Sequence, residues 1–194
     1  QGEEIGMTNP HYQNIGQYRD VESQNYYQIL MEQGKTKEEA LAVLAARSRD
    51  NGRTPMQWSS GKHAGFTEGT PWIETGDRAG EINVQLQRGE EDSIYWFYRQ
   101  LIALRKRKNA ISKGSIVFIE KENPDVLGYQ RRYGKEEIIV LNNLTKQEAK
   151  AEAGEGWGDY QKILGNYPGE FSDSLDGTGQ IRLRPYETIV LERS

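Results

Sequence analysis

The stretch Ser48-Arg49-Asp50-Asn51-Gly52-Arg53-Thr54-Pro55-Met56-Gln57-Trp58 separates two differently patterned parts of the chain. The sequence before it favours helices, whereas the sequence after it contains a long irregular segment, one helix and many short strands. Proline lacks a backbone N–H and glycine destabilises helices, so Gly52 and Pro55 exclude a helix interior here. The stretch is therefore predicted as a polar loop, and loops on a rigid scaffold often carry binding residues.

Two helices are predicted before this loop. Residues 18–33 carry apolar side chains at broadly helical spacing, and Gly34 follows as a stop signal. Thr36 stands three residues before Glu39, which is the pattern of a capping box at the start of the second helix. Residues 1–15 are predicted as the end of a strand that runs into a loop.

After the loop, residues 59–82 are rich in glycine and are predicted as an irregular but ordered segment, because they contain large aromatic side chains. A helix capped by Asp92 or Ser93 follows, since apolar residues recur on one of its faces. Beyond Asn109, short β-rich segments alternate with turn residues, which indicates an antiparallel β-sandwich. These segments lie near residues 114–119, 126–133, 137–142, 146–152, 160–164, 179–184 and 187–192.

The composition excludes several classes of function. The 194 residues include 25 Lys and Arg against 29 Asp and Glu, so there is no basic excess to bind nucleic acid. The sequence contains no apolar run of about 18 residues, so no membrane span is predicted. Cysteine is absent and only two histidines occur, which argues against disulfides, metal sites and a metal cofactor, and fits a cytoplasmic location.

Two motifs have both a catalytic or binding interpretation and a structural one. Paired carboxylates hydrolyse glycosides, but Glu3 and Glu4 would point to opposite faces of a strand and could not line one pocket. The rings of Trp58 and Trp72 could stack on a sugar. Anchoring of the loops is the favoured role for both tryptophans.

Arg49 and Arg53 leave two roles open. The guanidinium group offers a rigid fork of donors that suits carboxylates and vicinal hydroxyls. The same fork could equally tie one loop to another. The residues alone therefore indicate carbohydrate binding only weakly.

The decapeptide from Arg49 to Trp58 closely resembles a motif of glycoside hydrolase family 13, in its α-glucosidase subgroup. That subgroup contains trehalose-6-phosphate hydrolases, oligo-1,6-glucosidases and dextran glucosidases. The resemblance extends over nearly the whole chain and is weakest from about residue 145 to 178. The other matching segments are residues 1–9, 63–66, 71–73, 81–84 and 183–187.

The resemblance implies a fold of class α+β for this length of chain. Residues 1–110 would be the end of a (β/α)8 TIM barrel, with its last strand, loops and helices. Residues 111–194 would be the C-terminal antiparallel all-β domain, a β-sandwich.

The resemblance also implies a retaining mechanism with an Asp nucleophile, a Glu acid/base and a second Asp. In the family these carboxylates follow the fourth, fifth and seventh barrel strands, so the resemblance implies that they precede Gln1. The absence of an Asn-His-Asp motif from the chain is consistent with this. The 194 residues alone are therefore predicted to have no catalytic residue and no activity on p-nitrophenyl α-glucoside. The N-terminal part of the same enzyme is the expected partner.

For the site, Arg49 matches the arginine that binds the non-reducing glucose at subsite −1, paired with an Asp from outside the chain. Glu22 matches the acid that contacts the sugar at subsite +1. Asp50, Arg53 and Trp58 are expected to brace the loop.

The substrate implied first is trehalose 6-phosphate, hydrolysed to glucose and glucose 6-phosphate. Isomalto-oligosaccharides, the substrates of oligo-1,6-glucosidases and dextran glucosidases, are the alternative. A non-catalytic carbohydrate-binding or structural β domain is the alternative of another class.

Overall fold

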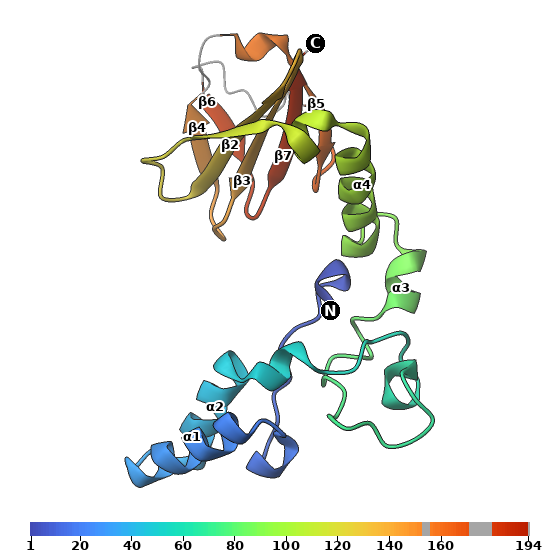
Figure 1. Ribbon diagram of the computed structural model, residues 1–194, viewed down its shortest axis with the longest axis vertical. Coiled ribbons are helices and arrows are strands. Elements are labelled where there is room, and N and C mark those ends of the chain that lie inside the picture. The colour runs from blue at the N-terminus through green and yellow to red at the C-terminus, as the bar shows by residue number, and fades with distance from the viewer. Residues whose placement is uncertain (153–155, 171–179, 194) are drawn as a thin grey trace. The chain divides into compact units, whose positions relative to one another are not determined.

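The computed structural model describes residues 1–152, 156–170 and 180–193 (Figure 1). The chain divides into two compact units, Gln1–Tyr98 and Arg99–Ser194. The division falls within helix α4 (Ile94–Arg107), and the first strand begins later, at Ser115.

Unit 1 contains the two predicted helices, α1 (Val21–Glu32) and α2 (Lys37–Arg47), which pack side by side (Figure 1). The capping box is confirmed, because the Thr36 side chain accepts from the Glu39 N–H and the Glu39 carboxylate accepts from the Thr36 N–H. Gly34 follows α1 with a φ of 82°, as a stop signal requires. The helices enclose an apolar core of Tyr12, Tyr18, Tyr27, Leu30, Ala40, Leu41, Leu44 and Ile73.

The predicted strand at the start of the chain is wrong in this structure. Residues Glu3–Ile5 form a 3-10 turn, η1, bracketed by Gly2 (φ 91°) and Gly6 (φ 68°). A strand needs a paired neighbour, and none of residues 1–98, all of which the structure describes, is in a strand. The Glu4 carboxylate accepts a hydrogen bond from the Gly2 N–H within this turn, so it is used locally.

The remainder of unit 1 consists of short elements and loops, as the glycine content predicts. The 3-10 turns are η2 (Ile15–Gln17), η3 (Arg49–Gly52) and η4 (Lys62–Gly65). The short helix α3 (Val84–Gly89) was not predicted, and it begins where the Asn83 side chain accepts from the Leu86 N–H. Among the described residues, no helix has the length and hydropathy needed to cross a lipid bilayer.

Unit 2 contains the predicted antiparallel strands. After the short helix α5 (Asn109–Lys113), a five-stranded sheet has the order β1-β2-β3-β7-β5, and β4 pairs with β6. Each of the seven predicted segments overlaps one strand, and the 3-10 turn η5 (Trp157–Asp159) precedes β5. The strands are β1 (Ser115–Ile119), β2 (Val126–Tyr133), β3 (Glu136–Asn143), β4 (Ala149–Glu152), β5 (Tyr160–Gly165), β6 (Gln180–Leu183) and β7 (Thr188–Arg193).

The core of unit 2 lies between these two sheets. Strand β4 alternates buried and exposed residues, which is the pattern of a strand that covers a core with one face. Leu141 and Ile189 face each other on β3 and β7 and are fully buried. The core cluster comprises Val126, Ile139, Leu141, Ala149, Ala151, Tyr160, Ile181, Leu183, Ile189 and Leu191.

Candidate functional site

The loop after α2 is fixed by a buried carboxylate. Asp50 lies in η3 and is fully buried. Its Oδ2 atom accepts hydrogen bonds from the backbone N–H groups of Arg19 (2.7 Å) and Asp20 (2.8 Å). Its Oδ1 atom lies 3.3 Å from Arg53 Nη1. Asp50 therefore joins the loop to the residues that begin α1.

A second buried carboxylate, Asp20, caps α1. Its Oδ2 atom accepts hydrogen bonds from the N–H and the hydroxyl of Ser23, both at 3.1 Å. Its Oδ1 atom lies 3.0 Å from Arg49 Nη2 and 3.4 Å from Arg53 Nη1. Burial by itself raises the pKa of Asp20, but the hydrogen bonds from Ser23 and the charge of Arg49 outweigh it and lower the pKa below its usual value.

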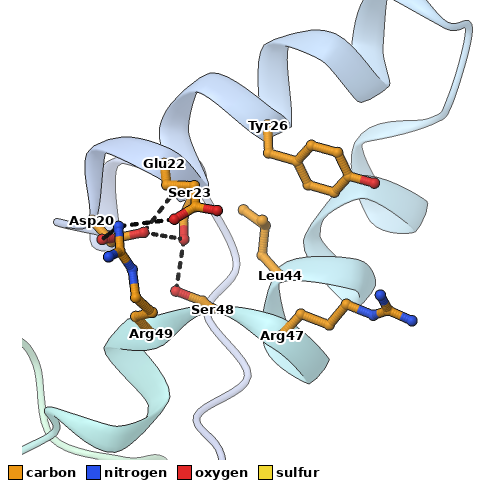
Figure 2. A pocket seen from close by; sticks show the side chains of 8 residues that line it. All are labelled: Asp20, Glu22, Ser23, Tyr26, Leu44, Arg47, Ser48 and Arg49. Atoms are coloured by element: carbon orange, nitrogen blue, oxygen red, sulfur yellow. Dashed lines mark hydrogen bonds and ion pairs between the residues drawn. The ribbon is translucent and has the colours of Figure 1, made fainter.

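Arg49 connects this buried carboxylate to an exposed one. The same Nη2 atom that contacts Asp20 lies 2.9 Å from Glu22 Oε2 (Figure 2). The Arg49 side chain is 58% exposed and that of Glu22 is 75% exposed. The guanidinium group is thus held from behind while much of it faces solvent.

Two serine hydroxyls join the helices next to these charges. Ser23 Oγ on α1 and Ser48 Oγ at the end of α2 are 2.8 Å apart, and both residues are buried. Ser48 Oγ also accepts a hydrogen bond from the Asp50 N–H at 3.1 Å. The start of α1 and the end of α2 are therefore linked through a continuous polar network (Figure 2).

The network forms one end of a pocket of about 220 Å³ between α1 and α2. Tyr26 and Arg47 lie on the other side of Leu44, away from Arg49 (Figure 2). The complete lining is Asp20, Glu22, Ser23, Tyr26, Leu44, Arg47, Ser48 and Arg49. Carboxylates, guanidinium groups, hydroxyls and one aromatic ring together can hydrogen-bond a polyol and contact its C–H groups.

The structure brings some of the predicted site residues together and separates one. Glu22 and Arg49 share the pocket, whereas Asp50 and Arg53 lie behind it as supports. Arg49 pairs with Asp20 and Glu22 of its own chain, in addition to any Asp expected from outside it. Trp58 does not line the pocket. Its ring is half-exposed, while its N–H donates to Ala64 and its C=O accepts from Gln85.

The sequence reasoning missed Asp20, Ser23, Tyr26 and Arg47. Asp20 carried a signal, because an Asp directly before a helical pattern is a typical N-cap. The other three acquire their places only when α1 meets α2 in the fold. Among the residues that the structure describes, no group of three or more His, Cys, Asp or Glu side chains could hold a metal ion.

Comparison with known families agrees with this architecture. The family model for the catalytic domain of alpha amylase matches residues 1–114. The model for the C-terminal domain of maltogenic amylase matches residues 116–173. The chain belongs to the alpha-amylase family, because the first match covers more than half of its residues.

Individual relatives are similar along the whole chain. A trehalose-6-phosphate hydrolase of Escherichia coli is 40% identical over 97% of the chain, and an oligo-1,6-glucosidase of Bacillus cereus is 40% identical over 99%. The chain spans 34% of the length of each of these relatives. The crystal structure of a trehalose-6-phosphate hydrolase from Bacillus licheniformis covers 99% of the chain with a TM-score of 0.89 and 38% identity, and the match spans 35% of that structure's chain.

Proposed function

We propose that this chain is the C-terminal portion of a retaining α-glucosidase and that Arg49 and Glu22 bind its sugar substrate. The observation that carries the proposal is the Arg49 guanidinium, which the buried Asp20 holds at the edge of an open pocket. A donor that is already oriented loses little entropy when it binds a hydroxyl. Glu22 adds an exposed acceptor 2.9 Å from the same guanidinium.

The rest of the proposal follows the family. The Asp nucleophile, the Glu acid/base and the second Asp would be contributed by polypeptide outside residues 1–194. We place the boundary between the barrel portion and the all-β domain near residue 110, in α5, which agrees with the family matches that end at residue 114 and begin at 116. The cytoplasmic location stays a prediction.

Trehalose 6-phosphate is the substrate that we propose first. The E. coli trehalose-6-phosphate hydrolase and the B. cereus oligo-1,6-glucosidase are equally identical to this chain, so overall similarity does not separate the two activities. The α-1,6-linked oligosaccharides of glucose are therefore the second candidate. A non-catalytic role for the all-β unit is compatible with either.

The test uses the full-length protein that contains this chain, assayed on trehalose 6-phosphate and on isomaltose. Arg49→Ala is expected to lower kcat/KM about 10- to 100-fold, because a hydrogen bond to a charged group contributes about 1.5–3 kcal/mol. Arg49→Lys should recover part of that loss. Arg107→Ala, an exposed arginine at the end of α4, is the matched control and should change nothing. Unchanged kinetics in Arg49→Ala would contradict the proposed site, and no turnover of either substrate by the unaltered protein would contradict the proposed activity.

A further inference from the structure

The pocket lining contains a second arginine, Arg47, besides Arg49. Arg49 is paired with Asp20 and Glu22. For Arg47, in contrast, the described part of the chain provides neither an ion pair nor a hydrogen bond to its side chain. Arg47 is also exposed, so its charge is available to a ligand.

Tyr26 supplies a second polar group at the same end of the pocket. Tyr26 is 44% exposed, and the pocket lining includes both Tyr26 and Arg47 (Figure 2). A phenol donates one hydrogen bond and a guanidinium donates several. Together they form a donor-rich end, whereas the end at Glu22 offers acceptors.

We propose that Arg47 and Tyr26 bind the phosphate of a phosphorylated disaccharide, which makes them specificity-determining residues. This inference rests on the proposed function and deepens it by selecting between its two substrates. Arginine binds phosphate through two parallel N–H···O bonds, which gives both affinity and geometric selectivity.

The size and charge of the pocket fit this assignment. Its volume of about 220 Å³ is below the roughly 300–1,000 Å³ of sites that enclose a whole ligand. It therefore suits one sugar ring or one substituent, with the rest of the substrate outside. Both carboxylates of the lining are in ion pairs, Glu22 with Arg49 and Asp20 with Arg49 and Arg53. They lie on the Arg49 side of Leu44, away from Arg47 (Figure 2), so their negative charge opposes an anion at Arg47 only weakly.

Arg47 has a competing structural role, because it lies in the last turn of α2, where a cation stabilises the helix dipole. That role affects stability and does not distinguish substrates. Arg47→Lys keeps the positive charge at the helix end but loses the bidentate geometry. The two roles therefore predict different kinetics for the same variant.

The experiment measures KM and kcat of the full-length protein and its variants on trehalose 6-phosphate and isomaltose. Arg47→Ala is expected to raise KM for trehalose 6-phosphate about 10- to 100-fold and to leave KM for isomaltose within about twofold. Arg47→Lys should give an intermediate KM, and Tyr26→Phe a rise of about threefold to tenfold. Arg107→Ala is the matched control.

Inhibition measurements test whether the site recognises a sugar phosphate or free phosphate. Inhibition by glucose 6-phosphate should weaken in Arg47→Ala while inhibition by glucose is unchanged, and inorganic phosphate should inhibit less strongly than glucose 6-phosphate. Equal changes in KM for both substrates, or no change, would overturn the proposal. So would an unaltered protein that cleaves isomaltose but not trehalose 6-phosphate, a result that leaves the α-glucosidase activity itself intact.

Discussion

The Asp50 Oδ2 atom accepts a hydrogen bond from the backbone N–H of Asp20 at 2.8 Å, across 30 residues of sequence. The buried Asp50 carboxylate thus positions the backbone of Asp20. The Asp20 carboxylate, in turn, holds the Arg49 guanidinium. The orientation of the Arg49 guanidinium therefore also depends on the Asp50 carboxylate, which acts through Asp20, and this dependence can be tested.

Asp50→Ala is expected to destabilise the protein by about 3–5 kcal/mol, because it leaves two backbone N–H groups and one Arg53 contact without their buried acceptor. Asp50→Asn keeps one carbonyl oxygen and should cost less. Urea unfolding of the full-length protein measures both. The exposed Glu148→Ala is the control, and an Asp50→Ala variant as stable as that control would refute the supporting role.

Asp20 predicts a pH dependence of stability. Its folded-state pKa is lowered, since the Ser23 hydrogen bonds and the Arg49 charge outweigh its burial. A lowered pKa stabilises the folded protein at pH values above the unfolded-state pKa of about 3.9. This contribution is lost as the pH falls through the folded-state pKa of Asp20.

The Asp20→Asn variant should therefore be less stable than the unaltered protein at pH 7, by about 2–3 kcal/mol. The difference should shrink below about pH 4. Unfolding free energies measured from pH 7 to pH 3 test this, with Glu148→Gln as the control. A difference that stays constant over the whole range would rule out the ionised Asp20 as its cause.

Tyr160 predicts the opposite dependence, at alkaline pH. Burial and the hydrogen bond that its O–H donates to the Glu137 carboxylate raise the pKa of Tyr160 to about 12. A raised pKa gives stability that is fully present below the unfolded value of about 10 and is lost as the pH rises toward 12. The Tyr160→Phe variant should therefore lose less stability between about pH 10 and pH 12 than the unaltered protein does.

Absorbance at the tyrosinate wavelength and melting temperature, followed together, provide the measurement for Tyr160. The variant should lack one late-titrating tyrosine. Tyr133→Phe alters a more exposed ring on β2 and is the matched control. Identical alkaline profiles for the Tyr160→Phe variant and the unaltered protein would show that this hydrogen bond has no energetic role.

Gly114 lies where α5 meets β1, and a side chain does not fit there. A Cβ at this position would clash with the carbonyl oxygen of Ala110 and would lie 2.7 Å from that of Arg132. Both are backbone atoms, so Gly114→Ala is expected to cost about 1–3 kcal/mol or more. Gly89→Ala, at the end of α3, meets no atom within 4 Å and should be neutral in the same thermal denaturation assay.

Local signals account for most of the fold that the sequence predicted. The Thr36–Glu39 capping box and Gly34 specify helix ends within a few residues, and turn residues after Asn109 separate the strands. The failures have a different physical origin. Helix α3 has six residues, too few to show a periodic pattern, and a strand at Glu3–Ile5 would require a distant partner to pair with.

The site was predictable only in part, because several of its contacts join residues that are distant in the sequence. Glu22 and Arg49 were identified by resemblance to a family, and the structure places them 2.9 Å apart. Asp20 is a helix cap in the sequence, but its contact with Arg49 exists only because α1 and the end of α2 meet. Tyr26 and Arg47 are 21 positions apart, and no local pattern joins them.

The position of β7 has a consequence for synthesis on the ribosome. β7 lies between β3 and β5, so the central ladder of the sheet needs a strand that is made roughly 45 residues after Asn143. At about 5–20 residues per second, β3 would wait a few seconds with one edge unpaired. The nascent chain is exposed to wrong strand pairing during that interval, so slowing translation within residues 144–187 should increase aggregation of the newly made protein.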